Sequence, residues 1–139
     1  MPRAAVDIGS NSVLLLVLAD DGTLLHDEAR VVGLGRGLGD KGMFRLDRMD
    51  AAVEALAHYA QTAQQLSVPP YDVAVAATSA ARRALNARSF IERVHNETGL
   101  RVRVISGEEE ARLTWKGALR ELSLPRGPIG VVDLGGGST

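Results

Sequence analysis

Aliphatic residues form short runs in the first part of the chain, separated by turns of small and polar residues. Residues 4–8 and 13–19 are rich in valine, leucine and isoleucine, and Gly-Ser-Asn-Ser follows the first run, so we expect two strands joined by a tight turn. Asp21-Gly22 is a strong hairpin signal, and a third strand is predicted over residues 23–32. Because the first two runs hardly alternate with polar residues, the meander predicts a sheet covered by helices on both faces.

A helical pattern follows in the middle of the chain. Glycine fills five of the ten positions 33–42, which predicts a loop, and the Gly37-x-Gly39-x-x-Gly42 match lacks the βαβ unit that dinucleotide binding requires. Apolar residues spaced by three and four then predict a helix that is capped by Asp47 and ends before Pro69-Pro70. This stripe comprises Met49, Val53, Leu56, Ala60 and Ala63.

Short strands and helices alternate through the rest of the chain. Residues 73–77, 100–105 and 129–134 are predicted strands, and Asn86 is predicted to cap a helix that stops at Gly99. Ser106 and Glu109 form a capping box that opens a third helix, which continues through Leu122 until the prolines at 125 and 128 end it. The predicted order β-β-β-α-β-α-β-α-β describes a mixed α/β lobe with helices covering the sheet.

Composition narrows the possible classes. A length of 139 residues with 45% hydrophobic residues suits one domain with its own core, so residues 1–139 are treated as a single lobe. The net charge of -1 does not call for nucleic acid or a membrane surface as partner. The sequence has no cysteine, which excludes disulfides, thiolate nucleophiles and cysteine-ligated zinc. With no apolar run long enough for a bilayer, we expect a cytoplasmic protein.

Both ends of the chain carry the same pattern: an aliphatic strand, Asp, one aliphatic residue, Gly and small hydroxyl residues. A carboxylate at a strand end, here Asp7 or Asp133, can hold a hard cation, and a side-chain-poor turn lets backbone N–H groups approach an anion. We therefore expect two loops that bind one phosphorylated ligand and its metal, although each Asp could simply cap its own turn. The predicted phosphate contacts are Gly9, Ser10, Asn11, Ser12, Gly135, Gly136, Gly137, Ser138 and Thr139.

Three consecutive glutamates stand in the first turn of the third predicted helix. Acids at such positions stabilise the helix dipole, so a structural role is open for Glu108, Glu109 and Glu110 alike. Glu109 is expected in the capping box, whereas Glu110 shares a helix face with Thr114 and lacks bulky apolar neighbours there. Glu110 is therefore the candidate to face a cleft as a general base.

A few other side chains are candidates for binding. Arg82 and Arg83 follow a predicted strand end and could bind a second phosphate or stand solvated in a loop. Trp115, on the third predicted helix, is expected in the core or at an interface rather than as a base-stacking platform. The histidines lack the spacing of metal ligands and are expected at surface or boundary positions; they are His26, His58 and His95.

Four segments resemble, in order, the signatures of the exopolyphosphatase and guanosine pentaphosphate phosphohydrolase family. They are VDIGSNS at 6–12, ATSAAR at 77–82, VISGEEEARL at 104–113 and DLGGGST at 133–139. The family belongs to the superfamily of actin, sugar kinases and Hsp70 ATPases, so the resemblance implies a ribonuclease-H-like lobe. It covers essentially the whole chain.

The resemblance also implies a reaction and roles for individual residues. The enzyme would hydrolyse terminal phosphoryl groups of inorganic polyphosphate or, alternatively, act as a guanosine pentaphosphate 5′-phosphohydrolase. Glu110 would activate water, Asp133 would help to hold Mg²⁺, Asp7 would act through the water shell of the ion, and Arg82 would contact the phosphate chain.

The same resemblance implies that the cleft needs more than these residues. The family has a second lobe and a metal-supporting glutamate directly after the second loop, and this sequence stops at Thr139. We therefore expect residues 1–139 to be an N-terminal lobe, cut at the start of the second, that hydrolyses little or nothing alone, and the longer protein to be a homodimer. Two other classes stay open: a kinase or ATPase lobe of the same superfamily, and a phosphate sensor without turnover.

Overall fold

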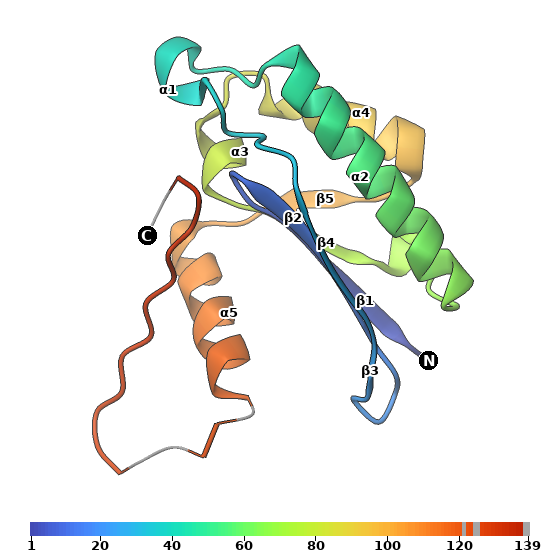
Figure 1. The fold of residues 1–139 in the computed structure, drawn as a ribbon, viewed down its shortest axis with the longest axis vertical. Helices are drawn as coiled ribbons and strands as arrows, with labels where there is room; N and C mark the ends of the chain where they lie inside the picture. The colour runs from blue at the N-terminus through green and yellow to red at the C-terminus, as the bar shows by residue number, and fades with distance from the viewer. Residues whose placement is uncertain (121, 124–125, 138–139) are drawn as a thin grey trace.

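A five-stranded mixed sheet forms the centre of the computed structural model, which describes residues 1–120, 122–123 and 126–137 (Figure 1). The sheet order is β3-β2-β1-β4-β5. The strands β1, β2 and β3 form the predicted antiparallel meander, whereas β4 pairs parallel with β1 and β5 pairs parallel with β4. The strands are β1 (Arg3–Ile8), β2 (Ser12–Leu18), β3 (Leu24–Val31), β4 (Ala74–Ala77) and β5 (Val102–Val104).

Helices follow the third strand and then alternate with strands. They are α1 (Leu38–Lys41), α2 (Leu46–Gln65), the 3₁₀ turn η1 (Pro70–Asp72), α3 (Ser79–Arg83), α4 (Ala87–Thr98) and α5 (Gly107–Leu119). The model therefore confirms the mixed α/β lobe. Within the described ranges no helix is long and apolar enough to cross a membrane.

The sheet is covered unequally, which corrects the expectation of two covered faces. In β1 and β2 alternate residues are buried, and α2 and α4 lie over that face (Figure 1). Residues on the other face stay accessible: Leu14 and Leu16 are each 39% exposed. The apolar runs of these strands thus supply one dense core face and one apolar face that is partly open.

The buried face carries the core. Leu15, Leu56 and Tyr59 are completely buried between β2 and α2, and burial of each large side chain contributes about 1.5–3 kcal/mol. Phe44 meets Phe90 of α4 edge to face, with ring centroids 5.5 Å apart. The apolar stripe that predicted α2 is confirmed as its core-facing side.

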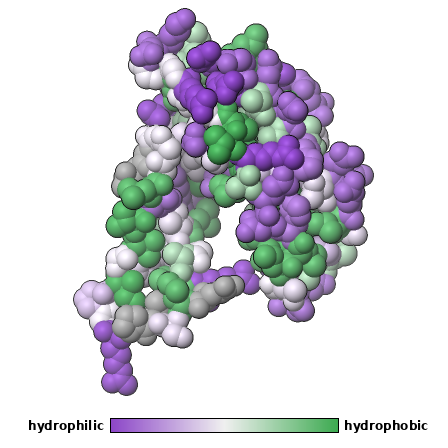
Figure 2. All heavy atoms as spheres, viewed as in Figure 1, coloured by the Kyte–Doolittle hydropathy of each residue, from purple (hydrophilic) through white to green (hydrophobic). Residues whose placement is uncertain are grey.

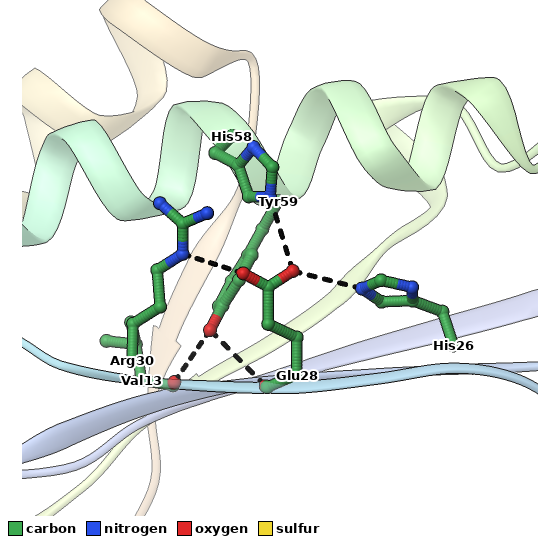
Figure 3. A network of polar contacts seen from close by, with 6 residues as sticks. All are labelled: Val13, His26, Glu28, Arg30, His58 and Tyr59. Atoms are coloured by element: carbon green, nitrogen blue, oxygen red, sulfur yellow. Dashed lines mark hydrogen bonds and ion pairs between the residues drawn. The ribbon is translucent and has the colours of Figure 1, made fainter.

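A polar cluster fastens α2 to the edge strand β3 (Figure 3). The carboxylate of Glu28 accepts hydrogen bonds from Arg30 Nε at 2.7 Å and pairs with His26 Nε2 at 3.0 Å and His58 Nε2 at 3.2 Å. These partners, Arg30 first, lower the pKa of Glu28 to about 2. The two histidines thus lie at partly exposed positions, as expected, but they share one carboxylate that their sequence spacing did not reveal.

Tyr59 extends this cluster into the core. Its hydroxyl donates to the Val13 carbonyl at 2.9 Å and to the Glu28 carbonyl at 3.3 Å, so it bridges β2 and β3 from the helix (Figure 3). Burial, together with the charge of Glu28, raises the pKa of Tyr59 to about 12. The hydroxyl therefore stays protonated and donates at all ordinary pH values.

Three local predictions differ from the structure near α1, α2 and α4. The predicted glycine loop over residues 33–42 contains the short helix α1. Asp47 does not cap α2: it lies in the first turn, where its carboxylate pairs with Arg45 and Arg48. Asn86 does occupy the N-cap position of α4, but its side chain makes no capping bond.

The side chain of Asn86 has a distant partner instead. Its Oδ1 accepts from the Phe44 backbone N–H at 2.8 Å and its Nδ2 donates to the Phe44 carbonyl at 3.0 Å. The amide therefore behaves like a short strand partner for the segment that leads into α2. The Asn86 side chain does not cap α4 because the backbone N–H and carbonyl of Phe44 bind both of its polar groups.

The predicted strand over residues 129–134 is wrong for this structure, and the predicted strand 100–105 shortens to β5. Residues 129–134 have a strand-like composition, but within the described part of the chain no backbone hydrogen bond joins them to the sheet. Val132 is 76% and Leu134 78% exposed. A strand requires a partner as well as propensity, and residues 129–134 have no partner strand among the described residues. The third helix ends at Leu119 instead of continuing through Leu122.

Candidate active site

The first Asp-Gly loop is the tight turn between β1 and β2, and the chain behind it holds it in place. Gly9 N–H donates to the Ser12 carbonyl at 3.0 Å. The Asn11 carbonyl accepts from Val32 and Gly33, and the Ser10 carbonyl accepts from Gly35 at 2.7 Å. The turn is thus fixed from the rear, while residues 9–12 line a cavity in front.

Asp7 lies on the open face of β1, one residue from the loop. Within the sheet it pairs with Leu14 of β2 and with Ala76 of β4, and its side chain lines the same cavity. Burial raises the pKa of Asp7 above its ordinary range, and the nearby charges of Glu110 and then Asp133 raise it further. Three carboxylates from distant parts of the sequence therefore share one electrostatic environment.

Glu110 faces the cavity from the start of α5, as predicted. Ser106 caps this helix by accepting from the Glu109 N–H at 3.1 Å. The predicted capping box forms only in this half, because the Glu109 carboxylate binds the Arg103 guanidinium through two 2.8 Å bonds, which lower the pKa of Glu109. Glu110 is the neighbouring acid that lines the cavity.

A salt bridge holds Glu110 in position. Arg82 Nη2 donates to Glu110 Oε2 at 2.9 Å, and its Nη1 donates to the carbonyl of Ile105 at 2.8 Å. Arg82 lines the cavity, as its predicted contact with phosphate requires. Its guanidinium is also fixed at two points, which orients the glutamate.

The second Asp-Gly loop meets the first one across the cavity mouth. A methyl group added at Gly136 would collide with Cβ of Asn11 and would lie 3.3 Å from its backbone nitrogen. The Cβ position of Gly137 is 3.3 Å from Ser10 Oγ. Only glycine permits this approach. Asp133 and Gly135 also line the cavity; Ser138 and Thr139, predicted as further contacts, lie outside the described residues.

The cavity has a volume of about 810 Å³ and is lined by polar and apolar groups together. The loops, Asp7, Glu110 and Arg82 supply the polar groups. The open sheet face, α5 and the C-terminal segment supply the apolar side chains: Leu14, Trp115, Val132 and Leu134. Figure 2 shows apolar residues on the side of the molecule formed by α5 and the C-terminal segment. Trp115 of α5 is 42% exposed. A cavity of this volume can hold a small-molecule ligand or cofactor.

Sequence reasoning did not include Thr78 among the site residues. It follows β4, lines the cavity and is 8% exposed, and its N–H donates to the Ile8 carbonyl at 3.2 Å. The available signal was its position: the carboxyl ends of adjacent parallel strands meet at one edge of a sheet, so residues after β1 and after β4 must be neighbours.

The carboxylates of the site suit a hydrated cation. Within residues 1–120, 122–123 and 126–137 no three His, Asp or Glu side chains are arranged to hold a metal ion directly. Mg²⁺ normally keeps several waters and uses one or two carboxylates together with substrate phosphates. The mutual repulsion that acts on Asp7 is the kind of field that a divalent cation offsets. The donor set therefore fits Mg²⁺ shared with a phosphate, and does not form an all-protein cage.

The fold and the cavity define the class of protein as a ribonuclease-H-like lobe of the actin-like type with two glycine loops. The model of the Ppx/GppA phosphatase family matches residues 17–139. An exopolyphosphatase from Cytophaga hutchinsonii is 30% identical, with a TM-score of 0.80 over 86% of this chain. The Aquifex aeolicus member of the Ppx/GppA family is 36% identical, with a TM-score of 0.77 over 85% of this chain. The chain belongs to the Ppx/GppA phosphatase family.

Two facts limit what this similarity says about function. The matched part of the chain corresponds to only 39% of the length of each of these two relatives. A ROK hexokinase from Thermus thermophilus, 16% identical with a TM-score of 0.52, shares the fold. The lobe architecture is therefore common to enzymes with other substrates, and the site residues have to carry the functional argument.

Proposed function

We propose that the protein containing this chain removes terminal phosphoryl groups from inorganic polyphosphate by attack of water, with release of orthophosphate. The observation that carries the proposal is the cavity in which both glycine loops face a glutamate that is held by an arginine. The loops offer backbone donors for phosphoryl oxygens. Glu110 offers a base whose oxygens are already oriented.

Each residue has a separate task in this proposal. Glu110 accepts the proton of the attacking water, and Arg82 keeps its carboxylate aimed into the cavity. Residues 9–12 and 135–137 bind the phosphoryl groups. Asp7 and Asp133 would hold hydrated Mg²⁺, which supplies charge neutralisation for the phosphoryl oxygens when it is bound.

A second candidate is hydrolysis of guanosine pentaphosphate at the same residues. The apolar part of the cavity lining favours it, because Trp115 and Leu14 offer surface to a nucleobase that polyphosphate would not use. Rates measured side by side on polyphosphate and on guanosine pentaphosphate decide between the two. A preference for the nucleotide would replace the first candidate while leaving the residue roles intact.

The variant Glu110→Gln tests the proposed base in a protein that carries these residues together with the second lobe of the family. We expect phosphate release to fall about 10²- to 10⁴-fold while binding of polyphosphate persists. Glu108→Gln is the matched control, since it removes the same charge from the same helix turn outside the cavity lining. Equal turnover for Glu110→Gln and the unmodified protein would remove Glu110 from the mechanism.

We also propose that residues 1–139 alone bind phosphate compounds but hydrolyse them little, because they correspond to only 39% of the length of the two relatives described above. Phosphate release from long-chain polyphosphate should be measured for residues 1–139 and for the two-lobed protein. Comparable rates would contradict this part of the proposal and would show that the single lobe suffices.

A further inference from the structure

Two consecutive arginines at the end of α3 have different surroundings. Arg82 reaches Glu110 and the Ile105 carbonyl, as described above. Arg83 lies on another side of the same short helix and does not line the main cavity. A role for Arg83 therefore has to come from its own neighbours.

The guanidinium of Arg83 stands where the two glycine loops meet. Its Nη2 is 3.6 Å from the Cβ position of Gly137, and that same position is 3.3 Å from Ser10 Oγ. Gly137 of the second loop thus lies beside both Ser10 of the first loop and Arg83. Its Nε makes a long bond of 3.4 Å to the Ser79 carbonyl, which anchors the near side of the group.

Arg83 also has no competing anion in the described part of the chain. Among residues 1–120, 122–123 and 126–137, no Asp or Glu side chain lies within ion-pair distance of it, and neither Nη atom has a hydrogen-bond partner. By contrast, Arg88 on α4 pairs with Glu92 at 2.9 Å. An arginine at the last turn of a helix interacts favourably with the helix dipole, but this accounts for its charge and not for its place beside the contact between the two loops.

We propose that Arg83 binds a second phosphate group of the substrate, adjacent to the one held by the loops. This inference rests on the proposed function, because it needs a ligand with at least two linked phosphates. The planar fork of arginine matches phosphate oxygens. Arg83 therefore selects phosphate chains over orthophosphate, while Arg82 positions the base.

Binding of phosphates of different length tests this selection in the 139-residue chain. Trp115 is the only tryptophan of the sequence and lines the cavity, so its fluorescence reports occupancy directly. The probes are orthophosphate and tripolyphosphate. For Arg83→Gln we expect affinity for tripolyphosphate to fall about tenfold, the loss of one charge-assisted contact, with affinity for orthophosphate changed less than about twofold.

Two further variants serve as controls. Arg88→Gln removes the same charge from a fully solvated position and should bind both probes like the unmodified chain. Arg83→Lys should recover part of the tripolyphosphate affinity, because it restores the charge without the fork. A circular dichroism spectrum and melting temperature equal to those of the unmodified chain establish that each variant is folded.

The outcomes separate this inference from the proposed function. If the unmodified chain binds tripolyphosphate more tightly than orthophosphate and Arg83→Gln does so equally well, the role of Arg83 is disproved and the proposed function stands. If Arg88→Gln weakens binding as much as Arg83→Gln, the effect is one of net charge, and the role of Arg83 is again disproved. If the unmodified chain binds neither probe, the proposed phosphate site itself is wrong.

Discussion

The two Asp-Gly loops are nearly equal in sequence and very unequal in support. The first loop joins two paired strands, and backbone hydrogen bonds from Val32, Gly33 and Gly35 tie its carbonyls from behind. The second loop follows residues 129–134, which pair with no strand in the described part of the chain. The motif alone therefore does not determine the rigidity of a loop; the neighbouring chain does.

This difference assigns the two loops separate parts in binding. The first loop is preorganised, so its contribution to affinity costs little further ordering. The second loop reaches the site through its contact with Asn11 and Ser10, and its geometry depends on that contact. Changes at the second loop should thus alter ligand binding, whereas changes behind the first loop should alter stability as well.

The largest effect is expected from Gly136→Ala. The added methyl group would collide with Asn11, so the loops must separate and the donors that surround a phosphate move apart. We expect tripolyphosphate affinity to fall about tenfold to a hundredfold, equivalent to charge-assisted bonds worth about 1.5–3 kcal/mol, with an unchanged melting temperature. Gly130→Ala is the control, because a methyl group there meets no atom within 4 Å. Equal affinity for both variants would show that the loops need not touch.

A smaller effect, on the stability of the fold rather than on ligand affinity, is expected from Gly35→Ala. Its Cβ would lie 3.2 Å from both Cβ and the carbonyl oxygen of Ser10, and the backbone of the first loop would have to shift. We expect the free energy of unfolding in urea to fall by about 1–3 kcal/mol. Gly39→Ala, where a methyl group meets open space, should not destabilise. An unaffected Gly35→Ala variant would contradict the idea of a rigidly held first loop.

The smallest effect concerns the polar cluster around Glu28, which fastens α2 to β3. The folded-state pKa of Glu28 lies near 2, below its ordinary value of 4.5, so its pairing stabilises the fold above about pH 4.5 and the stabilisation is lost as the pH falls toward 2. We expect Glu28→Gln to lower the unfolding free energy by on the order of 1 kcal/mol near neutral pH, after allowance for solvent screening. The difference from the unmodified chain should shrink at the acid end of this window.

The matched control for Glu28→Gln is Glu54→Gln, on the exposed side of α2. It should leave the pH dependence of unfolding unchanged over the same window. A constant stability difference between Glu28→Gln and the unmodified chain at every pH would show that packing, and not the charge of Glu28, fastens α2 to β3.

Periodicity predicted the parts of this fold that depend on nearby residues. The apolar stripe of α2 and the meander of β1 to β3 are local patterns, and both are confirmed. Helix spacing also identified Glu110 as the acid that faces the cavity, because neighbours at one helical turn fix which side of α5 it occupies.

The parts that sequence reasoning missed depend on distant partners. Asn86 bonds to Phe44 instead of capping its own helix, and His58 shares the Glu28 carboxylate with His26 from another element. Residues 129–134 have the composition of a strand but no partner strand in the described residues. In each case the presence or absence of a long-range contact, which spacing along the sequence cannot report, decided the outcome.

The pairing of β1 with β4 has a consequence for the order of folding. The β1–β2–β3 meander joins residues close in sequence, but Ala5 pairs with Ala74, and the intervening chain must close a long loop before this contact forms. Such non-local pairings slow folding. Thr78 can join Asp7 at the cavity only after β4 has docked, so we expect the phosphate site to assemble late, after the hairpins and α2 have already formed.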